Sequence, residues 1–121
     1  MTYTSNNLMW QDTVETKTLK LNHLEAKVYC RKLRLASRYD WRVPTYYELS
    51  QLLDYSKSDP SIKNGIKNIS STNYRTSSQD INDKNRYWYI DFKNGYTDTI
   101  SKMKKQNIRC IRDISNEKGN Y

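Results

Sequence analysis

The stretch that most constrains the fold is residues 86–95, RYWYIDFKNG. Large apolar residues alternate with other residues along it, which is the two-residue period of a β-strand. One face of this strand would carry Trp88, Ile90 and Phe92, and the other Tyr87, Tyr89 and Asp91. The pair Asn94-Gly95 then predicts a type I′ hairpin turn, because both central positions of that turn need positive φ. We therefore expect an antiparallel hairpin whose second strand covers residues 96–100.

Two capping boxes predict where helices begin. Asn22 is followed three residues later by Glu25, and Thr45 is followed three residues later by Glu48. In each pair, reciprocal side-chain to backbone hydrogen bonds satisfy N–H groups that a helix start leaves unpaired. Pro44 fixes the direction in which the chain enters the second helix. We expect the first helix to run to about residue 36 and the second to about residue 54.

The rest of the chain is predicted to form strands and a long loop. Residues 8–12, 13–20 and 107–113 favour extended structure, whereas residues 55–73 are rich in Ser, Asn and Lys, which is typical of a loop. This order of elements is α+β, with two helices packed on a small, mostly antiparallel twisted sheet. A chain of 121 residues makes one domain, which we place at residues 1–114, with a flexible tail over residues 115–121.

The charge balance favours anionic partners. The formal net charge is +8, and residues 102–112 hold five basic residues and no acidic one. Such a surface attracts nucleic acid, acidic polysaccharide or an anionic membrane. A basic surface with no dedicated partner is an equal alternative. No apolar run approaches the roughly 18 residues of a membrane span, and no leader peptide is visible, so the protein is either cytosolic or shown without its leader.

Five segments in order resemble a bacterial domain family typified by the C-terminal domain of the Legionella collagen-like adhesin. The segments are LMWQD (8–12), EAKVYC (25–30), DWRVPT with EL (40–45 and 48–49), WYIDFKNG (88–95) and IRCIR (108–112). The resemblance implies a C-type-lectin-like fold related to that of formylglycine-generating enzymes. It assigns structural positions in the family motifs to Trp10, Trp41, Pro44, Thr45, Glu48 and Trp88.

The resemblance also implies a disulfide between Cys30 and Cys110, because C-type-lectin-like domains commonly join the first helix to the last strand. The alternative is two buried thiols. A bridge would indicate export to an oxidising compartment, the periplasm or the cell surface.

Catalysis and cofactors are not expected. The chain lacks the Glu-Pro-Asn, Gln-Pro-Asp and Trp-Asn-Asp triplets of calcium-dependent lectins, and it lacks the reactive cysteine pair of the formylglycine-generating enzymes. Two cysteines and one histidine cannot complete a four-ligand zinc site. His23 has neither an orienting carboxylate nor a nucleophile beside it in the sequence.

The aromatic and basic residues of the C-terminal third are the candidate binding residues. Tyr87 and Tyr89 share a predicted strand face, with Arg86 adjacent and Tyr96 across the hairpin. The full candidate set is Arg75, Arg86, Tyr87, Tyr89, Tyr96, Lys102, Lys104 and Lys105. Rings beside cations suit sulfated or carboxylated sugars, but they equally suit nucleobase stacking or a protein partner. A half-buried tyrosine face covered by the long loop is a further alternative.

These observations rank four functions. The first is an exported, non-enzymatic module that binds anionic polysaccharide, such as a sulfated glycosaminoglycan, without calcium. The second is a protein-interaction or assembly domain of a surface adhesin or fimbrial protein, with a homotrimer implied by the family relative. Nucleic-acid binding ranks third, because charge alone supports it and no nucleic-acid motif is present. Enzyme activity ranks last.

Overall fold

The computed structural model describes residues 1–114, and the predicted tail lies outside the described residues. The elements are β1 (Thr2–Ser5), β2 (Leu8–Gln11), α1 (Val14–Thr18), β3 (Lys20–Leu21), α2 (His23–Lys32), α3 (Tyr46–Ser50), β4 (Asn73–Asp80), β5 (Asp83–Asp91), β6 (Tyr96–Ser101), β7 (Gln106–Asn107) and β8 (Ile111–Asp113). The α+β class is therefore confirmed.

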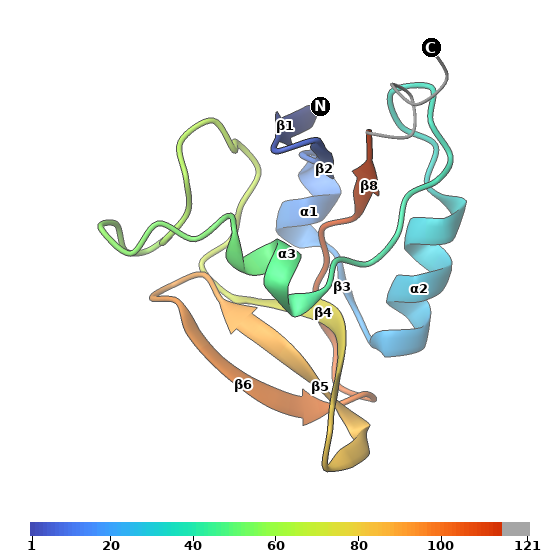
Figure 1. The fold of residues 1–121 in the computed structure, drawn as a ribbon, viewed down its shortest axis with the longest axis vertical. Helices are drawn as coiled ribbons and strands as arrows, with labels where there is room; N and C mark the ends of the chain where they lie inside the picture. Colours follow the sequence, from blue (N-terminus) through green and yellow to red (C-terminus); the bar gives the residue numbers. More distant parts are fainter. Residues whose placement is uncertain (115–121) are drawn as a thin grey trace.

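The strands form two sheets. One has the order β1-β2-β8, and the other has the order β3-β7-β4-β5-β6. All pairings are antiparallel except the one between β4 and β7. Figure 1 shows the long strands β4, β5 and β6 at one end of the molecule, the small sheet at the other, and α2 along one side.

Both predicted capping boxes are present, although both helices end earlier than expected. Asn22 Oδ1 accepts from the Glu25 N–H at 3.0 Å, and Thr45 Oγ1 accepts from the Glu48 N–H at 3.2 Å. α2 stops at Lys32 because Leu33 is extended, with ψ of 131°. After α3 the chain continues in i→i−3 turns as far as Leu53, whose N–H donates to Ser50 O at 3.1 Å.

The prediction of an extended segment over residues 13–20 was wrong, since α1 occupies most of it. Its threonines favour strands, but tertiary contacts override that preference. The Thr16 side chain is buried, and its Oγ1 lies 2.8 Å from Asn68 O. The helical conformation of α1 directs the Thr16 side chain toward the long loop, which includes Asn68.

The hairpin of β5 and β6 is confirmed, but its turn differs from the prediction. Four residues, 92–95, connect the strands, and of the Asn94-Gly95 pair only Gly95 has positive φ (85°). Phe92 is buried, and its N–H donates to Thr72 O at 2.9 Å. Burial of Phe92 therefore takes it out of the β5–β6 ladder and lengthens the turn.

Two hydrophobic clusters form the core. The first fills the space under α3 and the long loop, and the second packs α2 against the segment that leads into β8. The first contains Trp10, Leu49, Leu52, Leu53, Ile62, Tyr74, Ile90, Phe92 and Ile111. The second contains Ala26, Cys30, Leu35, Trp41, Val43, Ile108 and Cys110. Trp10, Trp41 and Pro44 are buried, as expected of structural residues, whereas Trp88 is half-buried.

The predicted final strand is divided between the two sheets. β7 pairs with β3 and β4, β8 pairs with β2, and buried residues 108–110 connect them. Cys110 forms the implied disulfide with Cys30, with a Cα–Cα distance of 5.6 Å. The bridge therefore ties α2 to the segment just before β8.

Candidate functional site

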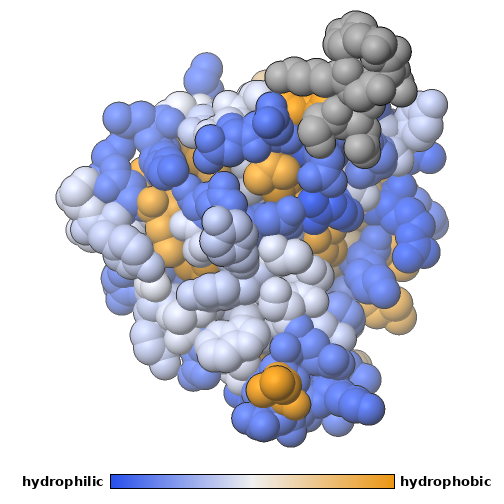
Figure 2. Space-filling model, in the orientation of Figure 1, coloured by the Kyte–Doolittle hydropathy of each residue, from blue (hydrophilic) through white to orange (hydrophobic). Residues whose placement is uncertain are grey.

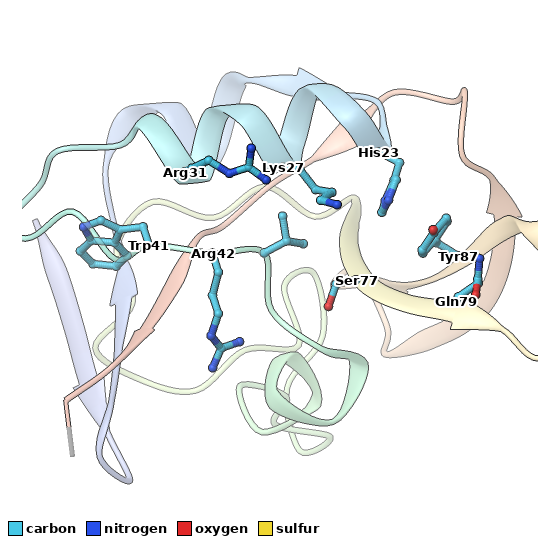
Figure 3. Close-up of a pocket in the computed structure, with 9 residues that line it drawn as sticks. His23, Lys27, Arg31, Trp41, Arg42, Ser77, Gln79 and Tyr87 are labelled. Atoms are coloured by element: carbon cyan, nitrogen blue, oxygen red, sulfur yellow. The ribbon is translucent and has the colours of Figure 1, made fainter. Parts of the chain in front are cut away.

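A groove of about 380 Å³ lies between α2, residues 41–43 and the strands β4 and β5. We call it the basic groove. Its lining residues are His23, Lys27, Arg31, Trp41, Arg42, Val43, Ser77, Gln79 and Tyr87. Figure 3 shows His23, Lys27 and Arg31 along one side of α2, with Tyr87 and Gln79 near the His23 end and Trp41 near the Arg31 end. Four of the nine lining residues are basic and none is acidic.

α2 places its three basic groove residues at regular spacing. The capping box starts the helix at His23, and a spacing of four residues keeps Lys27 and Arg31 on the same face. Lys27 and Arg31 are exposed, and within residues 1–114 neither forms an ion pair. Their positive charge is therefore available to a ligand.

Arg42 contributes less charge to the groove than its position suggests. Its Nη1 and Nη2 donate to the two carboxylate oxygens of Glu48 at 2.8 and 2.7 Å, and Nη2 also lies 3.2 Å from Asp113 Oδ2. The sequence assigned Glu48 only to the capping box of α3, and the second partner, Asp113, is distant in the chain. Glu48 therefore caps α3 and neutralises Arg42 at the same time.

His23 forms the other end of the groove. Its ring stacks on Tyr87, with centroids 3.8 Å apart and planes 18° apart. Its Nδ1 is buried and has no hydrogen-bond partner among the described residues. Burial lowers the pKa of His23 below its ordinary 6.5, and the charges of Arg75, Lys27 and Lys102 lower it further. His23 is therefore mostly neutral at pH 7.

Arg75 is not a surface contact, which corrects the prediction. Its side chain is fully buried, with Nε 3.3 Å from Leu21 O and Nη2 2.5 Å from Lys104 O. The Nη1 atom has no partner among the described residues. Burial lowers the pKa of Arg75 to about 10, so the guanidinium remains charged at pH 7. Arg75 adds positive potential beneath the groove, but a ligand in the groove cannot contact its buried side chain.

The predicted cluster of Tyr87, Tyr89, Tyr96 and Arg86 is divided among different surroundings. Tyr96 is exposed, and its hydroxyl lies 3.2 Å from Asp98 Oδ2, while Asp98 pairs with Tyr89 across β5 and β6. Burial and the charge of Asp98 raise the pKa of Tyr89. The carboxylate of Asp98 makes the surface around Tyr89 and Tyr96 unfavourable for a polyanion.

Arg86 lies on the opposite face of β5 from Tyr87 and Tyr89. Its guanidinium donates to Thr99 of β6, with Nε 3.0 Å from Thr99 Oγ1 and Nη2 2.6 Å from Thr99 O. These bonds fix Arg86 along the hairpin. Of the predicted ring and arginine residues, only Tyr87 lines the basic groove.

The three predicted lysines lie in the β6–β7 connection and are exposed. Lys102 O accepts from the His23 N–H at 3.0 Å, which holds this connection against the start of α2. Lys105 Nζ lies 3.7 Å from Glu25 Oε1. Lys104 supplies the carbonyl that Arg75 contacts. The structure therefore brings Lys102 to the groove's His23 end, with Lys105 partly neutralised nearby.

A second, aromatic hollow adjoins the basic groove through the shared residue Gln79. We call it the aromatic shelf. It is lined by Thr45, Tyr46, Tyr47, Ser78, Gln79 and Trp88. The rings of Tyr46 and Trp88 are 5.9 Å apart and tilted by 58°, and Tyr47 is 73% exposed. Such rings can stack on the apolar face of a sugar while their polar ends stay in water.

Sequence reasoning missed Lys27 and Arg31 as candidate binding residues. The signal was present, because His23, Lys27 and Arg31 recur every four residues in a predicted helix. What the sequence could not supply was the opposite wall. That wall comes from Ser77 and Gln79 of β4 together with Tyr87 of β5, and the sequence of β4, NYRTSSQD, lacks the apolar alternation that predicts a strand.

Within residues 1–114, no group of His, Cys, Asp and Glu side chains is arranged to hold a metal ion. None of the helices there has the length and apolar character needed to cross a membrane. Figure 2 shows one face as mainly hydrophilic, with hydrophobic residues in small separate patches. Polar and charged contacts therefore dominate what this face can offer a ligand.

Residues 1–112 match the family model described as the Lcl C-terminal domain. No curated protein matches the chain.

Proposed function

Since the chain belongs to the Lcl C-terminal domain family, we propose that it is a non-enzymatic module that binds anionic polysaccharide, of the sulfated glycosaminoglycan type, without calcium. The observation that carries this proposal is the pair Lys27 and Arg31. Both are exposed in the basic groove, and neither has an acidic partner within residues 1–114. Because the protein itself does not neutralise these charges, they can attract a polyanion.

The surface beside the basic groove suits a polymeric ligand better than a single ion. The aromatic shelf adjoins the groove through Gln79. One sugar of a chain can place its sulfate or carboxylate near Lys27 while another packs on Tyr47. Arg42 is already paired with Glu48, so it positions the groove wall rather than binding the ligand.

The C-type-lectin-like fold and export to the periplasm or cell surface belong to the same proposal. The disulfide supports both, because it joins α2 to the segment before the last strand and because such bonds persist in oxidising compartments. Mass measurement of the protein from native cell fractions, without reductant, tests export. A bridged form in the periplasmic or surface fraction agrees with it, and a reduced form in the cytosol contradicts it.

Heparin-affinity chromatography with a salt gradient tests the binding function. We expect Lys27→Ala/Arg31→Ala to elute at distinctly lower salt than the natural protein. The matched control is Lys63→Ala/Lys93→Ala, which removes the same charge from exposed positions that do not line the groove. Ala is a good helix former, so α2 remains intact. Equal elution of the two variants would contradict the proposal.

A second candidate is a protein-interaction or assembly domain of a surface adhesin or fimbrial protein. The exposed Tyr96 beside Asp98 favours it, because aromatic residues are common in protein interfaces and this surface repels polyanions. β6 is also an edge strand of its sheet. Light scattering tests self-assembly into a trimer. A trimer that Tyr96→Ala dissociates supports this candidate, whereas a monomer at high protein concentration removes it.

A further inference from the structure

His23 occupies a confined position at one end of the basic groove. Its ring is stacked on Tyr87 of β5, and its backbone N–H is bound to Lys102 O. Its Nδ1 is buried without a partner among the described residues. A proton added to that nitrogen would find no acceptor in the described chain, which favours the neutral ring.

The charges that face His23 come from several elements. Lys27 and Glu25 lie on α2 with it, Arg75 lies on β4, and Lys102 lies in the β6–β7 connection. The Glu25 carboxylate already accepts from the Asn22 N–H at 3.0 Å and lies 3.7 Å from Lys105 Nζ. The surroundings of His23 are therefore positive overall.

We propose that His23 is a proton-linked contact for an anionic group, a sulfate or carboxylate of the polysaccharide, bound at this end of the groove. This inference rests on the proposed function. An anion placed near Lys27 and Lys102 offsets the positive charges that keep the imidazole neutral. Protonation of His23 then becomes easier, so the complex takes up a proton that the free protein does not hold.

The direction of the pH dependence follows from linkage. In the free protein, burial lowers the pKa of His23 below 6.5, and the cations Arg75, Lys27 and Lys102 lower it further. In the complex the anion raises that pKa. By reciprocity, the affinity for the anion increases as the pH falls through the pKa of the complex, and it levels off below the pKa of the free protein. Each unit of difference between the two pKa values gives about a tenfold change in affinity.

The chain offers a clean test because His23 is its only histidine. Between pH 5 and 7 no other side chain has its ordinary pKa in the window. The experiment measures the dissociation constant for a heparin-derived octasaccharide at fixed salt across this range. We expect the affinity of the natural protein to rise roughly tenfold from pH 7 to pH 5. His23→Gln should show a flat profile, whatever its absolute affinity.

Three further measurements exclude trivial explanations. Circular dichroism at each pH checks that both proteins stay folded, and Lys63→Ala/Lys93→Ala should keep the profile of the natural protein. In NMR, the one imidazole Cε1–H resonance should titrate with a higher pKa when the octasaccharide is present. That shift would not follow from a purely structural role of His23.

The outcomes separate the two proposals. Binding that requires Lys27 and Arg31 but is independent of pH, or a His23→Gln variant that keeps the pH dependence, overturns this inference alone. Absence of octasaccharide binding at both pH 5 and pH 7 overturns the proposed function together with it. A pH-dependent affinity that disappears in His23→Gln, together with the raised imidazole pKa, supports it.

Discussion

Two buried arginines, Arg109 and Arg75, lie in contrasting surroundings. Arg109 is 1% exposed, its Nη1 donates to Gln11 O at 2.6 Å, and the same atom lies 3.5 Å from Asp12 Oδ1. Arg75 is also fully buried, but it binds only carbonyl oxygens, and within residues 1–114 it forms no ion pair. Arg109 is therefore neutralised by a carboxylate inside the protein, whereas Arg75 is not.

The difference distinguishes a region that holds the fold together from the region to which we assign binding in the proposed function. Asp12 accepts from the N–H groups of Lys67 and Asn68 at 2.9 and 2.8 Å, so it ties the long loop to Arg109 and the core. Around Arg75, by contrast, Lys27 and Lys102 add positive charge, and within residues 1–114 no acid forms an ion pair with Arg75. Uncompensated charge costs stability, and a polyanion in the basic groove would offset it.

The largest effect is expected from removing the bond that joins the two regions. The disulfide closes a loop across a sequence separation of 80, linking α2 of the groove to the residue next to Arg109. Cys30→Ala/Cys110→Ala should lower the free energy of unfolding by about 4–5 kcal/mol, because the unfolded chain gains entropy. Urea denaturation monitored by circular dichroism measures the change. A loss below about 1 kcal/mol would mean that the bridge contributes little.

Asp12→Ala should destabilise the region around Arg109, where the buried cation has a carboxylate partner. It leaves Arg109 buried without its carboxylate and leaves two backbone N–H groups without acceptors. We expect a loss of roughly 3–4 kcal/mol, at the lower end for a broken buried ion pair, because the oxygen and nitrogen are 3.5 Å apart. Asp98→Ala is the matched control, since Asp98 is exposed. Similar losses in both variants would contradict the structural role of Asp12.

Low pH should reduce the stability that the Asp12 carboxylate contributes. Burial raises the pKa of Asp12, but hydrogen bonds from Lys67 and Asn68 and the charge of Arg109 outweigh it, so the pKa lies below the ordinary 3.8. The stability that this carboxylate contributes is therefore present above about pH 4 and is lost as the pH falls through its folded pKa. As the pH is lowered from 6 to 2.5, the denaturation midpoint of the natural protein should fall more steeply than that of Asp12→Asn. Parallel curves would show that Asp12 does not carry the effect.

Arg75→Met should have the smallest effect on stability. The substitution removes a buried cation that lacks an acidic partner and replaces it with an apolar side chain of similar length. We expect a change within about 1 kcal/mol, because lost hydrogen bonds to two carbonyls are offset by relief from burying the charge. Heparin affinity should nevertheless decrease. A loss as large as that of Asp12→Ala would remove the distinction between the two arginines.

The sequence predicts those parts of the fold that local chemistry decides. Asn22 with Glu25 and Thr45 with Glu48 locate both helix starts, because a capping box is a contact between residues three apart. The alternation in β5 likewise predicts the hairpin with β6. The disulfide and the family followed from resemblance, and both are confirmed.

Parts that depend on distant contacts were not predictable. β4 has the composition of a loop and becomes a strand because β5 pairs along it and buries Tyr74 and Thr76. For the same reason Arg75 was assigned to the surface, since nothing local shows that the carbonyls of Leu21 and Lys104 surround it. The basic groove needs both β4 and α2, so its location could not be predicted before β4 was known.

The most direct test of the account is the salt dependence of polyanion binding. We would measure the dissociation constant for a heparin-derived octasaccharide at several salt concentrations and compare Lys27→Ala/Arg31→Ala with Lys63→Ala/Lys93→Ala. Each lost contact should reduce the slope of log affinity against log salt by roughly 0.7–0.9, as for nucleic-acid polyanions. The account predicts a reduction of roughly 1.4–1.8 in the groove variant alone. Equal slopes in the two variants would contradict the assignment of binding to the basic groove.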